Sequence, residues 1–498
     1  MKLLNPGYRL NRKDLSYIEN FVRDKNYDER TMRPRAAFLG DGYCYAARAV
    51  KKRWGLDYCF VEVGHKRIKT RYFSSEVNKL SGGIWLTKIN RDRGFVDRTI
   101  KEMQALLTYG EDLRRLKFKN NLSVVEIRKN IFNQLKWTIK IHEFSQLWAG
   151  VDYIKDSVEE EIKKLFGDSS KKMQDIISTL SCPLKMPLQN VEERDLIRMV
   201  KMSGVRLDMA IKNHAHKYGY VVMRDISDEP FGQEYYTDRL KKIQTNKDEY
   251  EKLKDRLSVF EREIIKAGKI IKEAKIPRGL KDKIKFIRWF LYFRTEISDY
   301  FRISNGVYKP VFIEISKRFN LSLETVLNMT YKEIVDSLGG KISNKLKKIV
   351  LDRTNNGYGL LIMTPPKKSF LVTGKEVDIV DGIFSGSVDK KIKNIIGKVA
   401  FRGNVTGIAR VIVDRTKANE LKEGEILVTT MTGPEFFIGI KGCSGIITNE
   451  GGLTTHAAIM AREFGKPCII GTQIATDVIK TGQSITIDGD RGMVIIND

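Results

Sequence analysis

Apolar residues recur at spacings of three and four positions over long stretches in the middle of the chain. Between residues 99 and 166 the series includes Ile127, Ile131, Leu135, Trp137 and Ile141. This spacing places apolar side chains on one helix face and predicts long helices that pack on one another. The same pattern continues at residues 191–218, 238–275 and 281–319. We therefore predict a mainly α-helical domain over residues 99–385.

Apolar and polar residues alternate in two short runs near the N-terminus, at residues 58–63 and 67–73. This period of two predicts two strands, and Gly64, His65 and Lys66 between them predict the turn of a hairpin. A helical pattern at residues 43–54 precedes the hairpin. Residues 1–98 are therefore expected to form a small α+β module.

The C-terminal part contains a short β-branched run, a glycine pair and then a run of good helix formers. Residues 445–448 predict a buried strand, and the alanine-rich stretch from His456 onwards predicts a helix. His456 is therefore expected at or just before a helix N-terminus. Unpaired backbone N–H groups and the helix dipole would stabilise an anion there by roughly 0.3–2 kcal/mol per interaction.

The residues around His456 suit a phosphoryl group. Gly451 and Gly452 allow close backbone approach or a positive φ, and Thr454 or Thr455 can cap the helix or donate a hydroxyl to phosphate. The reference pKa of imidazole, about 6.5, leaves much of it neutral and nucleophilic. The alternative is a capping or structural histidine in an ordinary strand–turn–helix unit.

Five blocks of the C-terminal segment match a known pattern in the same order. They lie at residues 403–411, 425–435, 451–463, 465–471 and 485–489, and the third has the sequence GGLTTHAAIMARE. Together they resemble the mobile phosphohistidine domain of the phosphoenolpyruvate-utilising enzymes, which include phosphoenolpyruvate synthase, pyruvate phosphate dikinase and rifampicin phosphotransferase. The resemblance implies a swivelling β/β/α domain over residues 390–498.

The same resemblance assigns roles to residues of this domain. It implies that His456 is phosphorylated and dephosphorylated during turnover. It further implies that the phosphate is supported by Gly451, Gly452, Thr454, Thr455 and Arg462. Asn449 is a departure from the pattern, because many relatives have Asp or Arg at this position.

A weaker resemblance extends upstream. Residues 294–338 are similar to the helical segment that precedes the histidine domain in rifampicin-phosphotransferase-like proteins, although a generic pair of amphipathic helices would have the same pattern. By this resemblance, the candidates for binding the phosphoryl acceptor are His216, Tyr218, Arg224 and Asp225. His214 and His216 are expected on different helix faces, so we predict no joint metal site.

Complete members of this family carry an ATP-grasp domain, and the dikinases add a C-terminal barrel. We expect neither in this chain, because too few residues precede the predicted helices and follow the signature histidine. The pattern of a phosphate-binding P-loop, G-x-x-x-x-G-K-[ST], is also missing from the sequence. ATP and Mg²⁺ are therefore expected on a partner ATP-grasp subunit. An unfamiliar nucleotide site within the first 100 residues or so stays open as an alternative.

Composition favours a multidomain protein of the cytoplasm. The chain has 498 residues, no run of 18 apolar residues and five scattered cysteines, which suggest reduced thiols without a disulfide framework or zinc site.

The formal net charge is +27. Positive and negative side chains are balanced in residues 397–498, so the excess positive charge lies upstream. A basic body attracts polyanionic substrates, RNA or an acidic subunit equally well. Aromatic-plus-glycine RNA motifs are missing from the sequence, so nucleic acid is not expected.

These features support two hypotheses. The first is a phosphotransferase, or the phosphohistidine-carrying subunit of a split ATP-dependent dikinase or synthase, which passes a phosphoryl group through His456 to a small alcohol, phenol or pyruvate-like acceptor. The alternative is a non-catalytic, basic helical protein that binds RNA or a partner subunit and keeps a relict swivelling domain.

Overall fold

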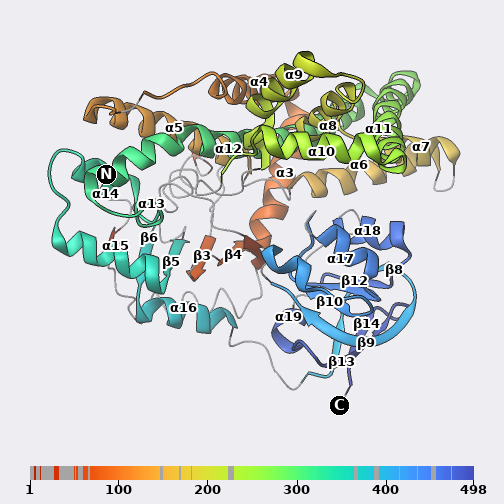
Figure 1. Cartoon of the computed structure of the whole chain (residues 1–498). Coiled ribbons are helices and arrows are strands. Elements are labelled where there is room, and N and C mark those ends of the chain that lie inside the picture. The colour runs from red at the N-terminus through yellow and green to blue at the C-terminus, as the bar shows by residue number, and fades with distance from the viewer. Residues whose placement is uncertain are drawn as a thin grey trace.

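The computed structural model shows an α+β chain with a helical body and two sheets (Figure 1). The residues that it describes are 5–6, 12, 27–32, 50, 52–53, 60–65, 68–119, 121–145, 150–167, 170–180, 182–222, 229–363, 368–385, 392–413, 415–433, 436–449, 456–472 and 474–497. Most of the helix predicted at residues 43–54 lies outside these ranges.

The first sheet combines strands from distant parts of the chain. Its strands, in the spatial order β1-β6-β5-β3-β4-β2, are β1 (Asn5–Pro6), β6 (Lys368–Thr373), β5 (Tyr358–Met363), β3 (Phe60–His65), β4 (Ile68–Ser74) and β2 (Tyr27–Met32). The predicted hairpin is confirmed, since β3 and β4 pair antiparallel from Phe60↔Phe73 to His65↔Ile68. However, β5 and β6 complete this sheet, although the predicted division assigns them to the helical domain. The strands of residues 1–98 therefore do not form a sheet by themselves.

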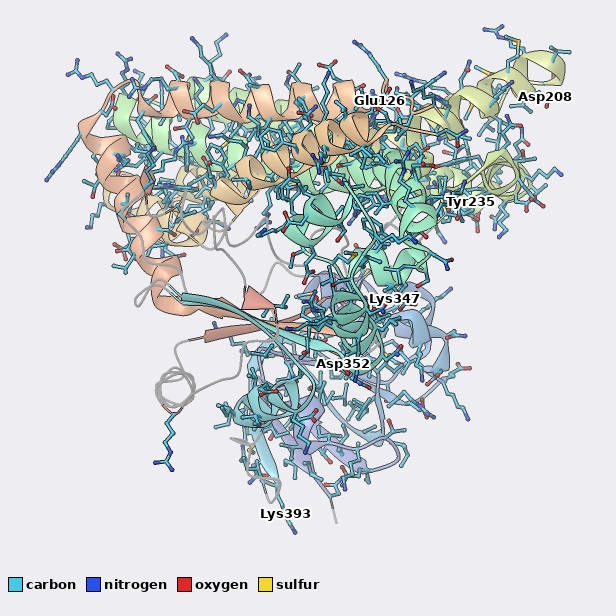
Figure 2. The ribbon with its side chains drawn as sticks, turned by 90° about the vertical axis from the view of Figure 1, so that its left-hand side faces the viewer. Glu126, Asp208, Tyr235, Lys347, Asp352 and Lys393 are labelled. Carbon is cyan, nitrogen blue, oxygen red and sulfur yellow. The ribbon has the colours of Figure 1, made fainter. Side chains whose placement is uncertain are left out.

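The helical body follows the first sheet. Its helices are α3 (Ser75–Arg91), α4 (Phe95–Leu113), α5 (Val124–Ser145), α6 (Gly150–Phe166), α7 (Lys171–Thr179), α8 (Leu188–Arg198), α9 (Gly204–Tyr218), η1 (Gly219–Val222), α10 (Gln233–Thr245), α11 (Lys247–Glu273), α12 (Arg278–Phe319), α13 (Leu323–Leu327), α14 (Tyr331–Ser337) and α15 (Asn344–Asn356). Figure 2 shows Asp208 and Tyr235 at one end of this body and Lys347 and Asp352 of α15 below it. Helix α16 (Lys375–Ser385) packs on β5 and β6.

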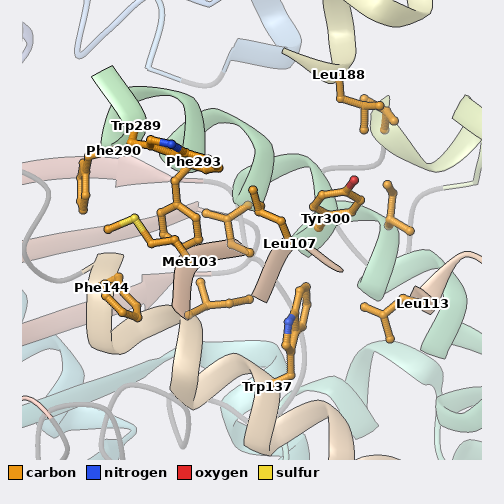
Figure 3. Packing of buried hydrophobic residues seen from close by; sticks show 14 of the residues in the cluster. Met103, Leu107, Leu113, Trp137, Phe144, Leu188, Trp289, Phe290, Phe293 and Tyr300 are labelled. Atoms are coloured by element: carbon orange, nitrogen blue, oxygen red, sulfur yellow. The ribbon is translucent and has the colours of Figure 1, made fainter. Parts of the chain in front are cut away.

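The 42-residue helix α12 is the centre of the body and packs against α4, α5 and α6. Figure 3 shows Met103 of α4, Phe144 of α5 and Phe293 of α12 in this core, and each is at most 1% exposed. The rings of Phe144 and Phe293 meet edge to face with centroids 5.7 Å apart. Burying each such side chain contributes about 1.5–3 kcal/mol, so these contacts fix α4 and α5 on α12.

The helical predictions are largely confirmed. The five residues named for the first series are all buried, because the three-and-four spacing directs them toward the core. The predicted span 191–218 is two helices, α8 and α9, which are separated by residues 199–203. Residues 375–385 form α16, which lies within the region predicted to be mainly helical.

The second sheet forms the C-terminal part. Its spatial order is β7 (Asn394–Ile396), β14 (Met493–Ile496), β13 (Ser484–Asp488), β9 (Asn404–Val411), β10 (Ile426–Thr429), β11 (Gly445–Thr448), β12 (Cys468–Ile470) and β8 (Lys398–Phe401). Strands β9 to β12 run parallel, and the remaining pairs are antiparallel. The helical elements of this part are η2 (Arg415–Glu420), α17 (Phe437–Gly442), α18 (His456–Phe464) and α19 (Ala475–Val478).

Both faces of the parallel strands are buried. On β11, Ile446 belongs to a cluster with residues of α17 and α18, whereas Ile447 belongs to a second cluster with residues of β13, β14 and α19. Successive side chains of a strand point to opposite faces, so a strand covered on both sides needs a continuous apolar run. This explains why the residues of the GIIT strand alternate between two cores and none of them is exposed.

Gly397 joins β7 and β8, which are the two end strands of this sheet. A Cβ at Gly397 would lie 2.4 Å from Ile469 Cγ2 and 2.8 Å from the Ile470 carbonyl oxygen. The chain therefore passes too close to β12 for any side chain. We expect Gly397→Ala to destabilise the C-terminal part by about 1–3 kcal/mol in chemical denaturation.

Gly340 provides the matched control. A Cβ there would meet nothing within 4 Å, so Gly340→Ala should change the free energy of unfolding by less than about 0.5 kcal/mol. Equal effects of the two substitutions would contradict the close approach at Gly397.

Candidate functional site

His456 is the first residue of α18, which follows β11 in the chain. The sequence prediction of a strand at residues 445–448 and a helix beginning at this histidine is thus confirmed. Strand β11 pairs with β10 and β12 in parallel, so the carboxyl ends of the three strands meet at one edge. Ligand sites of open parallel sheets lie at such an edge, often beside a helix N-terminus.

Asn449 ties together the strand ends at this edge. Its backbone N–H donates to the Thr429 carbonyl at 3.0 Å, and its side-chain Nδ2 donates to Thr476 Oγ1 at 2.6 Å. The Thr476 N–H donates back to Asn449 Oδ1 at 3.0 Å. These bonds connect β10, β11 and the first turn of α19. Asn449, the residue that departs from the family pattern, therefore has a structural role. Asn449 is only 6% exposed.

Small side chains hold α18 against the sheet. Ala457, Ala458 and Ala461 are at most 2% exposed and pack in a cluster with Ile446 and Cys468. Alanine at these positions favours the helix and lets it lie close to the strands. Figure 1 shows α17 and α18 on the side of the C-terminal part that faces the helical body. The His456 backbone is thereby fixed at the sheet edge.

The other residues proposed to support phosphate are only partly placed. Gly451, Gly452, Thr454 and Thr455 lie outside the described residues, and Arg462 lies within α18. Their roles therefore stay predictions.

The structure describes two of the four proposed acceptor residues, His216 and Tyr218. His216 is exposed on α9, whereas Tyr218, two positions later, is buried. Arg224 and Asp225 lie outside the described residues. His214, in contrast, is buried and its Nε2 lies 2.9 Å from Glu192 Oε1. The prediction that His214 and His216 lie on different helix faces is therefore confirmed.

Tyr218 belongs to a polar cluster that the sequence did not indicate, together with Asp195, Arg114, Tyr300 and Glu111. Its hydroxyl donates to Asp195 Oδ2 at 2.5 Å, and the guanidinium of Arg114 lies 5.9 Å from the centre of its ring. The same guanidinium lies 5.5 Å from the ring of Tyr300, whose hydroxyl donates to Glu111 Oε2 at 2.8 Å. Burial, together with the bond to Asp195, raises the pKa of Tyr218, so its hydroxyl stays a proton donor.

The close approach of α4 and α12 creates this cluster. A Cβ on Gly110 would lie 2.5 Å from Tyr300 Cγ, so only glycine lets the Tyr300 ring lie against α4. The hydroxyl of Tyr300 then reaches Glu111, the next residue of α4. No local sequence pattern indicates this contact, because Glu111 and Tyr300 are 189 positions apart in the chain.

Glu296 of α12 carries an unusual carboxyl group next to this cluster. The side chain is 4% exposed, and burial raises its pKa from 4.5 to about 7, although the Leu188 N–H donates to it at 2.5 Å. The folded state therefore binds the proton more tightly than the unfolded chain. Stability should fall as the pH rises from about 4.5 to about 7, by up to about 3 kcal/mol.

We expect Glu296→Gln to remove this decline in urea unfolding curves measured from pH 4.5 to pH 8. Glu263→Gln on α11, where the carboxylate is exposed, is the control and should keep the wild-type pH dependence. An unchanged decline in Glu296→Gln would show that another group causes it.

No three His, Cys, Asp or Glu side chains among the described residues gather in a way that could hold a metal ion. No helix in the described part of the chain combines the length and the apolar composition needed to cross a membrane.

Comparison with known proteins identifies the C-terminal segment. Residues 421–492 match the family described as PEP-utilising enzyme, mobile domain, and this match includes His456. The segment thus belongs to the mobile domains of the phosphoenolpyruvate-utilising enzymes, as the sequence blocks predicted.

Individual relatives agree with this assignment. The phosphoenolpyruvate synthase of Pyrococcus furiosus is 50% identical over 90 residues, which cover 18% of this chain and 11% of that protein. The probable phosphoenolpyruvate synthase of Staphylothermus marinus is 50% identical over 100 residues, 20% of this chain and 12% of that protein. The chain thus spans only a small part of the length of these relatives.

A third relative matches over a longer stretch. The rifampicin phosphotransferase of Bacillus cereus is 34% identical over 176 residues, which cover 34% of this chain and 19% of that protein. This match is longer than residues 392–498, so it includes residues outside the C-terminal sheet.

Proposed function

We propose that this chain is a phosphotransferase component in which His456 carries a phosphoryl group from a nucleotide donor to a small acceptor. The observation that supports this most directly is the position of His456 at the start of α18, inside the segment that matches the mobile domain. The nine-residue helix α18 begins at His456, so the phosphorylated imidazole belongs to the residue at the positive end of the helix dipole. This arrangement offsets the charge that the phosphoryl group adds.

The two half-reactions are separate in this proposal. A neutral imidazole nitrogen attacks the phosphorus of the donor, so that a P–N bond forms while the bond to the leaving phosphate oxygen breaks. The acceptor oxygen then attacks the same phosphorus, the P–N bond breaks and the acceptor proton is released. Residues 390–498 swivel between the donor and acceptor sites, which lets each site exclude water independently.

The donor in this proposal is ATP bound with Mg²⁺ on a partner ATP-grasp subunit, in the cytoplasm. The acceptor is an alcohol, a phenol or a pyruvate-like acid, bound by the helical body over residues 99–385. The chain itself holds no tightly bound cofactor. Mixed with any ATP-grasp protein that a neighbouring gene encodes, the chain should accept label from either the β or the γ phosphate of ATP.

That pairing experiment tests the split arrangement. Label transferred only in the presence of the ATP-grasp protein supports a separate charging subunit, and the labelled position identifies the phosphate that is carried. Label transferred by the chain alone would place the nucleotide site on this chain. A lack of label, together with a salt-sensitive mobility shift of RNA, would favour a binding protein with a relict domain.

A further inference from the structure

Arg114 is the last residue before the loop that follows α4, and its guanidinium is almost enclosed, with the side chain 11% exposed. One end is paired, since Nη1 lies 3.3 Å from Glu111 Oε2. Nε and Nη2 are buried as well, and neither has a hydrogen-bond partner among the described residues. Leaving a buried polar group unpaired costs about 1–3 kcal/mol, and more for a charged group.

The surroundings hold this guanidinium in one orientation. The rings of Tyr218 and Tyr300 lie 5.9 Å and 5.5 Å from its central carbon, and the Tyr300 hydroxyl fixes the carboxylate of Glu111 that pairs with Nη1. Three helices, α4, α9 and α12, therefore position Arg114, while its Nε–Nη2 edge is left for another group. Such preorganised donors are typical of a binding site for an oxyanion.

The charges of the cluster select among oxyanions. Nε and Nη2 point in the same direction, so they match the two oxygens of one carboxylate or phosphate. Glu111 and Glu296 lie near the same guanidinium, and a phosphate dianion would be repelled by both carboxyl groups more strongly than a monoanion. A carboxylate group therefore fits this position better than a phosphate.

From this geometry we infer that Arg114 binds the carboxylate of a small organic acid through its Nε and Nη2 atoms. Under the proposed function, on which this step rests, the bound acid is the phosphoryl acceptor. The acceptor then carries a carboxylate, which Arg114 binds, and another oxygen, which is phosphorylated. Of the acceptors considered, this requirement selects the pyruvate-like acids and hydroxy acids over simple alcohols and phenols. Tyr218, the buried member of the predicted acceptor residues, is part of this site.

Calorimetric titration of the full chain tests the inference, with pyruvate and benzoate as carboxylate probes and benzyl alcohol and inorganic phosphate for comparison. Both carboxylates should bind at one site, and both comparison compounds at least tenfold more weakly. Arg114→Lys keeps the positive charge but cannot donate the two parallel hydrogen bonds of a bidentate guanidinium, so it should weaken carboxylate binding at least tenfold. Arg115→Lys, whose side chain is 80% exposed, is the matched control and should bind like the wild type.

A second variant separates binding from folding. Glu111→Gln removes a negative charge beside the site, so it should tighten carboxylate binding about threefold, which a purely structural role of the cluster does not predict. The inference is overturned if wild-type protein binds neither carboxylate, if phosphate binds more tightly than both, or if Arg114→Lys binds like the wild type. Label on His456 is measured in the same variants and should persist in Arg114→Lys. Its absence from the wild type would refute the proposed function without affecting the binding result.

Discussion

Replacing His456 by alanine should reduce phosphoryl transfer to the acceptor to at most about a thousandth of the wild-type rate. The imidazole is the nucleophile of the first half-reaction and the leaving group of the second, so its removal eliminates the covalent carrier. The fold should survive this substitution, because alanine is a good helix former and His456 is the first residue of α18. Acceptor phosphorylation, followed with the complete pair of proteins, measures the loss.

The matched control is His65→Gln at the end of β3. This variant should transfer phosphate at the wild-type rate, because His65 belongs to the hairpin of the first sheet. If His456→Ala retained a tenth or more of the activity, another residue would have to carry the phosphoryl group.

Replacing Arg353 by methionine should destabilise the protein by about 3–5 kcal/mol. Arg353 is 1% exposed, and its Nη1 and Nη2 donate to the two carboxylate oxygens of Glu333 at 2.8 Å and 2.7 Å. Glu333 also closes the capping box of α14, since Thr330 N–H donates to it at 2.8 Å. Without the arginine, a buried carboxylate loses its charge partner at the start of this helix.

Chemical denaturation compares this variant with two others. Lys332→Ala removes an exposed ion pair of α14 with Asp336, and it should cost less than about 0.5 kcal/mol. The double variant Arg353→Met/Glu333→Gln should recover part of the loss, because it no longer buries an unpaired charge. A loss below 1 kcal/mol in the single variant would show that the pair adds little to stability.

Local patterns predicted most of the helices and the strand–helix unit at His456. Residues 127–141 carry the three-and-four spacing of a buried helix face, and residues 445–448 are a short β-branched run that forms the buried strand β11. The sequence of helix α16, KEVDIVDGIFS, contains β-branched residues and a glycine that are weak helix formers, so local propensity gives only a weak signal for this helix. The pairing of β3 with β5 was missed because strand register between distant segments leaves no local signal.

The two candidate sites, at His456 and at Arg114, also differ in how far the sequence alone reveals them. His456 is recognisable because the residues predicted to support its phosphate, from Gly451 to Arg462, are close to it in the sequence. The Arg114 cluster brings together residues of α4, α9 and α12, so it becomes visible only when these helices pack. Of the predicted acceptor residues, the structure places Tyr218 beside this cluster and His216 on the exposed side of α9.

The most direct measurement is the location of phosphate on the wild-type chain after incubation with ATP and Mg²⁺, alone and with any ATP-grasp protein that a neighbouring gene encodes. Peptide mass spectrometry at alkaline pH preserves phosphohistidine and assigns the modified residue. We predict one acid-labile, alkali-stable phosphate on His456, which disappears when the acceptor is added. Phosphate on a different residue, or a chain that stays unmodified under these conditions, would contradict a phosphohistidine carrier.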